Sequence, residues 1–217
     1  FDDAENLAIS ITQDFPEHPF AWKVLGTVLG TTGIVVPFSC ASWIDSIHRG
    51  VDVALAQGIL HIAAATGSTS ESAIKKMFNL SEQALIDMGD FAGGLLKYLR
   101  RKPVERLTLV GGFGKLTKLA QGHLDLHSGR SSVDMRGLAE IARRAGGSQN
   151  TVKRIAGGNT ALEALNIAKE DNLKIANSIA AMARGTALAT LAGDMEVDVI
   201  VFDREGKLIG HASGDAS

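Results

Sequence analysis

The feature that most constrains the fold is a repeated order in which an apolar, β-prone run ends at a glycine-rich turn and a helical pattern follows. Residues 59–65 form a nearly continuous apolar run, which is typical of a strand buried on both faces of a parallel sheet. Residues 104–110 and 197–202 are also predicted as strands. Because strands alternate with helices over most of the chain, the sequence predicts an α/β fold with a Rossmann-like, doubly wound, mostly parallel sheet flanked by helices.

Apolar residues at helical spacing predict the helices between these strands. The clearest helix covers residues 40–57, and Gly58 ends it as a C-cap. A short strand is predicted at residues 24–29, with Ser39 as a cap for the first helix. Further helices are predicted at residues 71–78, 82–87, 90–102, 115–120, 135–145, 160–168 and 173–191.

The first 24 residues differ from the rest because Pro16 and Pro19 each force extended backbone on the residue before them. The sequence also opens at Phe1 rather than at a methionine. We therefore expect a piece of a longer protein. Residues 1–24 would be an irregular remnant or linker from a preceding domain, and residues 25–217 the Rossmann-like domain.

Composition excludes several classes of function. The 22 Lys and Arg residues are offset by 24 Asp and Glu residues, so the charge does not favour nucleic acid as a partner. The single cysteine, Cys40, rules out an internal disulfide framework and is expected to be a small buried hydrophobe. No apolar run reaches the roughly 20 residues needed to span a bilayer. A cytoplasmic protein without a membrane segment is expected.

Glycine-rich turns follow three of the predicted strands, at residues 30–33, 66–71 and 111–115. Ligands of open α/β sheets bind outside the carboxyl ends of the strands, where these turns would lie. The turns match neither the G-x-G-x-x-G fingerprint nor a Walker A motif. Tight packing, with Ser68 or Ser70 as an ordinary helix cap, explains the same residues. The local sequence leaves both interpretations open.

A polar, glycine-bounded loop at residues 122–130 carries the best candidates for acid–base chemistry. His123 and His127 have the spacing of two ligands on one helical face, but Leu124 stands where a zinc-binding H-E-x-x-H helix has its glutamate. We predict no metal site. A loop that presents His123, Asp125 and His127 could instead transfer a proton or bind a carboxylate-rich substrate.

Five segments are distinctive in their order and spacing along the chain. They are Leu29-Gly30-Thr31-Thr32-Gly33-Ile34-Val35 with Pro37, Ala65-Thr66-Gly67-Ser68-Thr69-Ser70-Glu71, Met88-Gly89-Asp90-Phe91, Leu109-Val110-Gly111-Gly112-Phe113-Gly114-Lys115-Leu116-Thr117-Lys118-Leu119-Ala120 and Gly122-His123-Leu124-Asp125-Leu126-His127-Ser128. Their combination resembles the CbiD family, from about residue 25 to residue 210. Members usually carry a histidine at the position of Gly112, and the large N-terminal α+β domain of the family is absent.

The resemblance implies methyl transfer from S-adenosylmethionine to C-1 of cobalt-precorrin-5B, giving cobalt-precorrin-6A in anaerobic cobalamin biosynthesis. It implies catalytic roles for His123, Asp125 and His127. The carboxylate-rich tetrapyrrole would bind to Gly111, Lys115, Lys118 and Arg130. The residues expected to hold the methyl donor are Gly30, Thr31, Thr32, Gly33, Thr66, Gly67, Ser70, Glu71, Gly89 and Asp90, with Glu71 in the place of the second-strand acid that binds ribose hydroxyls.

Other functions stay open on the residues alone. One is a non-catalytic α/β module that binds a nucleoside or an organic anion, and another is a nicotinamide-dependent oxidoreductase. The absent N-terminal domain is an expected partner, a homo-oligomer is possible, and the chain without that domain is expected to be inactive if that domain binds the acceptor.

Overall fold

The computed structural model describes residues 40–78 and 80–214, and from Ile47 onward these belong to one compact unit. The strand expected at residues 24–29, the turn at residues 30–33 and the cap at Ser39 lie outside the described residues. The strands are β1 (His61–Ala65), β2 (Leu85–Asp87), β3 (Arg106–Gly112), β4 (Glu196–Phe202) and β5 (Leu208–Ala212). The helices are α3 (Cys40–Ala56), α4 (Ser68–Phe78), α5 (Ala92–Leu99), α6 (Phe113–Ala120), α7 (Met135–Arg144), α8 (Gln149–Ala156), α9 (Ala161–Glu170) and α10 (Ile175–Leu191).

The described strands form one mixed sheet in the order β2-β1-β3-β4-β5. The first four are parallel, and β5 returns from β4 as an antiparallel edge strand. The predicted α/β class and the mostly parallel sheet are therefore confirmed. The order also reverses beside β1, because β2 lies on one side of that strand and β3 on the other.

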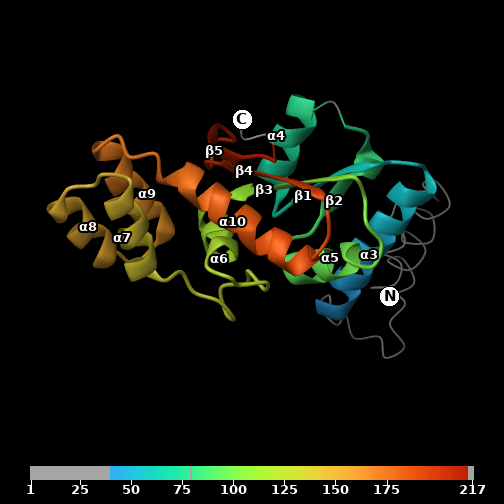
Figure 1. Ribbon diagram of the computed structural model, residues 1–217, viewed down its shortest axis with the longest axis horizontal. Helices are drawn as coiled ribbons and strands as arrows, with labels where there is room; N and C mark the ends of the chain where they lie inside the picture. The colour runs from blue at the N-terminus through green and yellow to red at the C-terminus, as the bar shows by residue number, and fades with distance from the viewer. Residues whose placement is uncertain (1–39, 79, 215–217) are drawn as a thin grey trace, which may run out of the picture. The chain divides into compact units, whose positions relative to one another are not determined.

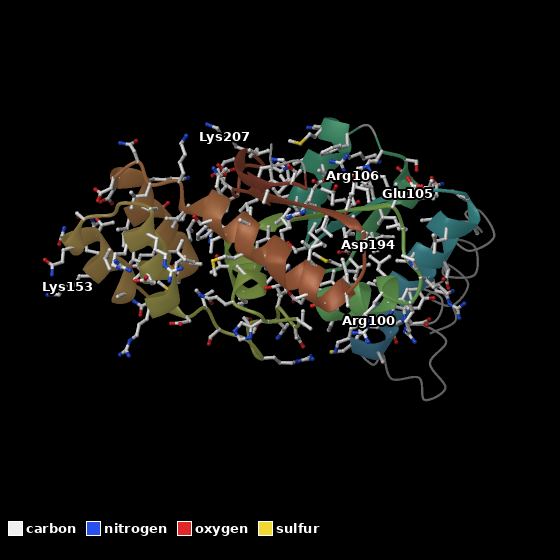
Figure 2. All side chains as sticks on the ribbon, viewed as in Figure 1. Arg100, Glu105, Arg106, Lys153, Asp194 and Lys207 are labelled. Atoms are coloured by element: carbon white, nitrogen blue, oxygen red, sulfur yellow. The ribbon has the colours of Figure 1, made fainter. Side chains whose placement is uncertain are left out.

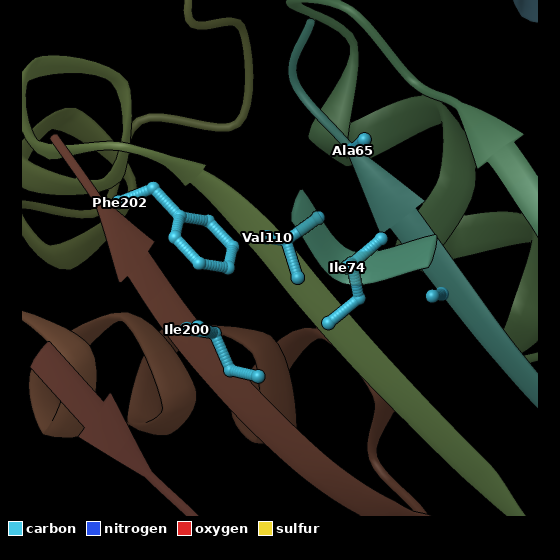
Figure 3. Close-up of a cluster of buried hydrophobic side chains, with 6 residues drawn as sticks. Ala65, Ile74, Val110, Ile200 and Phe202 are labelled. Atoms are coloured by element: carbon cyan, nitrogen blue, oxygen red, sulfur yellow. The ribbon is translucent and has the colours of Figure 1, made fainter. Parts of the chain in front are cut away.

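Helices cover both faces of the sheet (Figure 1). Helix α4 lies on one face, and α5, α6 and α10 lie on the other. On the α4 face, Ile74 packs against side chains from β1, β3 and β4 (Figure 3). The central strands are buried on both faces, as their continuous apolar sequence predicted. Because these strands pair in parallel, the carboxyl ends of β1, β3 and β4 lie side by side.

The chain between α6 and α10 forms a separate group of helices, α7, α8 and α9, at the left of Figure 1. Each begins with a side-chain cap, from Asp134, Ser148 and Thr160 respectively, which accepts a hydrogen bond from a backbone N–H of the first turn. The predictions for α7 and α9 are confirmed, whereas α8 was not predicted. Its flanking glycines and its two buried positions, Thr151 and Ile155, give little helical periodicity.

Two other predictions need correction. The helix expected at residues 82–87 is wrong, because residues 82–84 form a single 3-10 turn and β2 follows. The residues Gln83, Ala84, Leu85 and Ile86 suit either structure, and pairing with β1 decides between them. Helix α4 begins at Ser68, three residues before the predicted start, so the turn after β1 is short. Among the described helices, none is both long and apolar enough to cross a bilayer.

A polar network crosses the amino-terminal half of the sheet on the α4 face. Arg106 Nε donates to Asp198 Oδ2 at 2.6 Å, and the Asp198 side chain is only 4% exposed. His61 Nε2 lies 2.8 Å from Thr108 Oγ1. Figure 2 shows Arg106 at the amino end of β3, with Lys207 at the turn between β4 and β5. The network therefore lies at the opposite end of the strands from the glycine-rich turns.

His61 is expected to make stability depend on pH. Burial lowers the pKa of this imidazole below its ordinary 6.5, the Arg106 guanidinium lowers it further, and Asp198 acts in the opposite direction. The unfolded chain then binds a proton more readily than the folded one, so stability falls as the pH drops below 6.5. Urea unfolding at pH 7.5 and 5.5 should show a smaller loss for His61→Gln than for wild type. Equal losses in both proteins would contradict this assignment.

Candidate functional site

The candidate site lies where the strand order reverses. After β1 the chain enters α4 on one face, and after β3 it enters α6 on the other, so the two connections diverge from neighbouring strand ends. Open α/β sheets bind ligands at such a reversal. Three segments meet at this edge: Thr66-Gly67 after β1, Gly111-Gly112 at the end of β3, and residues 88–90 after β2.

Backbone pairing continues past the strands and holds these segments together. Thr66 N donates to Val110 O at 3.0 Å, and Met88 N donates to Ala65 O at 3.0 Å. The Thr66 side chain is buried against Gly111, where an added Cβ would lie 2.7 Å from Thr66 Oγ1. Thr66 therefore shapes the turn by packing, and Gly111 is glycine because the threonine occupies the space a side chain would need.

An ion pair joins the turn after β2 to α6. Lys115 Nζ donates to Thr66 O at 2.6 Å and lies 3.2 Å from Asp90 Oδ1. That oxygen is shielded from solvent and accepts no hydrogen bond from the described residues, because the ammonium is close but poorly aligned. The structure thus brings together Asp90, which was expected to bind the methyl donor, and Lys115, which was expected to bind the acceptor.

The start of α4 differs from the predicted capped helix. Ser70 is buried inside the first turn, and its hydroxyl donates to Gly67 O at 2.7 Å. Glu71 also lies in this turn, where its charge is favourable for the helix dipole. Whether Glu71 follows the second strand, as predicted, depends on the strand expected at residues 24–29, which lies outside the described residues.

The acids at the end of β2 are Asp87 and Asp90. Asp87 Oδ1 accepts a hydrogen bond from Gly89 N at 3.2 Å, and Gly89 adopts a positive φ of 54° in the turn. Asp87 was not among the predicted site residues, because residues 82–87 were assigned to a helix. The signal was present as a polar turn, Asp-Met-Gly-Asp, directly after the apolar pair Leu85-Ile86.

The loop at residues 122–130 is irregular, as expected, and is ordered by its own polar groups. Asp125 accepts hydrogen bonds from His127 N at 3.1 Å and from the Arg130 guanidinium at 2.8 Å. His127 Nδ1 accepts from Gly129 N at 3.0 Å, which fits a neutral ring protonated on Nε2. His127 is exposed and His123 is partly buried. Both histidines lie in a loop, so their spacing of four residues does not bring them onto one helical face.

This loop is attached to the segment that carries Asp90. Leu126 N donates to Asp90 O, and Gly93 N donates to Leu124 O, both at 2.8 Å. Lys118 Nζ donates to Leu126 O at 2.9 Å and braces the loop from α6. The predicted acid–base residues and the ion pair of Asp90 with Lys115 are therefore parts of one connected structure.

Two alternatives for the site were considered. Among the described residues, no cluster of three or more His, Cys, Asp or Glu side chains could hold a metal ion. A shallow, open groove lies between α8 and α9, lined in part by Lys153, Thr160 and Glu170. Figure 2 shows Lys153 of α8 at one end of the compact unit, far from Arg100 at the carboxyl end of α5. No predicted site residue lines the groove, and we favour the strand ends because polar groups from three segments converge there.

The described residues form an α/β domain in which polar turns converge at the switch point of the sheet. Residues 125–213 match the family model described as CbiD, C-terminal domain. Over these residues the chain belongs to the CbiD family. No solved structure matches it.

Curated relatives extend this match toward the amino terminus. A protein of Methylorubrum extorquens, named cobalt-precorrin-5B C(1)-methyltransferase, is 55% identical over 184 residues, which cover 84% of this chain and 51% of that protein. A protein of Brucella canis with the same name is 56% identical over 184 residues, covering 84% and 50%. The chain therefore spans about half the length of the curated relatives it matches.

Gly112 is expected to accept a histidine side chain without a large loss of stability. It caps α6 with a φ of −72°, which any residue adopts, and an added Cβ would meet no heavy atom within 4 Å. The variant Gly112→His should unfold within about 0.5 kcal/mol of wild type, as surface substitutions do. Urea unfolding measures this difference. A loss above 2 kcal/mol would show that the end of β3 is more crowded than described.

Proposed function

We propose that the full-length protein carrying this chain transfers a methyl group from S-adenosylmethionine to C-1 of cobalt-precorrin-5B, giving cobalt-precorrin-6A. The observation that carries the proposal is the 55% identity, over 84% of the chain, to a protein named for that activity. A methyltransferase needs a methyl donor, and the strand ends described above suit a nucleoside-bearing one. The chain would serve as a Rossmann-like donor-binding domain.

The residues at the strand ends divide into those that shape the site and those that can contact the donor. Thr66 and Ser70 are buried and fix the turn after β1. Gly67, Gly89 and Asp90 retain exposure and can approach a ligand. The residues Gly30, Thr31, Thr32 and Gly33 stay part of the proposed donor site and lie outside the described residues.

The loop at residues 122–130 would face the tetrapyrrole. Arg130 and the two histidines, His123 and His127, supply groups that can bind carboxylates or accept a proton. Because the loop is attached to the backbone of Asp90, it can hold the acceptor carbon in a fixed relation to the donor. Such alignment removes roughly 7–11 kcal/mol of an activation barrier, which makes positioning the main task of these residues.

About half of each relative lies outside the matched region, and we propose that the corresponding part of this protein completes the acceptor site. The chain alone would then bind the donor and leave the tetrapyrrole unmethylated. A homo-oligomer would be a further way to complete the site.

The test is an anaerobic incubation of the full-length protein with cobalt-precorrin-5B and S-adenosylmethionine labelled in its methyl group. Mass analysis should find one labelled methyl group on the pigment, and fragmentation should place it at C-1. Calorimetry with S-adenosylhomocysteine and with NADH separates the rival functions. Binding of NADH alone would favour an oxidoreductase, and an unmethylated pigment with a bound donor would favour a non-catalytic module.

A further inference from the structure

The ion pair of Lys115 and Asp90 has unused capacity on both partners. A lysine ammonium carries three N–H donors, and within the described part of the chain one of them is used, in the bond to Thr66 O. An ionised carboxylate offers about four acceptor positions, and Asp90 Oδ1 accepts no hydrogen bond from the described residues. Both side chains are partly exposed, Lys115 by 39% and Asp90 by 25%.

The backbone beside this pair is open to a ligand. An added Cβ at Gly67 or at Gly112 would meet no heavy atom within 4 Å, and neither residue has the positive φ that would require glycine. Glycine at these two positions thus leaves space at the ends of β1 and β3. The contrast with the crowded Gly111 is direct, since that glycine is explained by packing.

A positive and a negative group separated by 3.2 Å complement a ligand group that carries both charges at similar spacing. The α-amino-acid group of a methionyl side chain has this form, with its carboxylate next to its ammonium. The carboxylate would accept from the free donors of Lys115, and the ammonium would donate to Asp90. The amino termini of α4 and α6 both lie at this edge and favour the carboxylate further.

We infer that Lys115 and Asp90 form the subsite for the amino-acid group of the methyl donor. This inference rests on the proposed function and moves Lys115 from the acceptor to the donor. The pairing also has an electrostatic purpose, because an unpaired lysine would repel the sulfonium of the donor. Asp90 offsets that charge while Lys115 holds the carboxylate. Specificity for a zwitterionic donor over a plain nucleoside then comes from these two side chains.

The test compares two ligands on the full-length protein. S-adenosylhomocysteine and 5′-methylthioadenosine share the nucleoside and the thioether, and only the first has the amino-acid group. By calorimetry, Lys115→Met should lower the affinity for S-adenosylhomocysteine at least tenfold, since a hydrogen bond to a charged group is worth about 1.5–3 kcal/mol. The same variant should change the affinity for 5′-methylthioadenosine by less than about twofold, which is within the additivity error of remote sites. Asp90→Asn should act in the same direction.

Two controls make the result specific. Lys118→Met removes a lysine from the same helix whose ammonium binds Leu126 O, and it should leave the ratio of the two affinities unchanged. Lys115→Arg keeps the cation and should retain the preference for S-adenosylhomocysteine, which also covers the case in which Lys115→Met does not fold. Equal weakening of both ligands, or weakening of neither, would overturn the subsite. A wild-type protein that binds neither ligand would overturn the proposed function itself.

Discussion

Replacing Gly111 with alanine is expected to destabilise the chain by about 2 kcal/mol, the usual cost of an added methyl in a packed interior. The new Cβ would lie 2.7 Å from Thr66 Oγ1, 2.9 Å from Thr66 Cγ2 and 3.2 Å from Leu116 Cγ. Thr66 is buried and short, so relief requires a shift of the turn after β1. That turn carries the carbonyl that binds Lys115, and S-adenosylhomocysteine should therefore bind more weakly as well.

The neighbouring glycine provides the matched control for this variant. Gly112→Ala adds the same methyl group one residue later, where no heavy atom lies within 4 Å. It should keep stability close to wild type. Urea unfolding of both variants measures stability, and calorimetry of Gly111→Ala measures its ligand affinity. Similar behaviour of the two variants would mean that Thr66 and Gly111 do not pack as described.

Removal of Arg106 is expected to have the largest effect on stability. The variant Arg106→Met leaves the Asp198 carboxylate, which is 4% exposed, without its ion-pair partner. Breaking a buried pair from one side costs about 3–5 kcal/mol, and we expect the lower end because the Arg106 side chain is itself 36% exposed. Chemical unfolding of the chain measures the loss.

Replacing the other partner of the pair, Asp198, should cost less stability. In Asp198→Asn the amide keeps the volume of the carboxylate and can still accept from Arg106, while the guanidinium retains contact with water. A loss of about 1 kcal/mol is expected, comparable to one hydrogen bond. If the two variants lose equal stability, the burial of Asp198 does not control the energetics of the pair.

The central strands could be predicted from the sequence because parallel strands buried on both faces read as continuous apolar runs. β1 has this property after His61, and β3 and β4 have it apart from Arg106, Thr108, Glu196 and Asp198. β2 does not, since its three residues lie at the edge of the sheet and their pattern also fits a helix. Its identity depends on pairing with β1, which is a tertiary interaction that local pattern does not contain.

The sequence indicated which strand ends carry the candidate site, but it did not indicate which side chains pair there. Glycine-rich turns after apolar runs indicated the ends of β1 and β3, and the structure places those turns beside each other. The ion pair of Asp90 and Lys115 joins residues 25 positions apart in the sequence. It follows from the position of β2 next to β1, so the missed strand also concealed the grouping of these two residues.

Helical spacing was a poor guide in the loop at residues 122–130. His123 and His127 are four residues apart, yet the backbone bonds of Leu124 and Leu126 to the segment at residues 90–93 hold this region in an extended, irregular form. Gly93 permits the approach, because an added Cβ there would lie 2.9 Å from Leu124 Cβ. The attachment of the loop to the donor turn is a property of the fold that no local motif encodes.

The central claim is that the carboxyl ends of β1, β2 and β3 bind the methyl donor. A crystal structure of the full-length protein with S-adenosylhomocysteine tests it most directly. The account predicts electron density for the ligand beside Gly67, Asp90 and Lys115, with its amino-acid group on the ion pair. Density for the ligand in the groove between α8 and α9, with the strand ends empty, would contradict it.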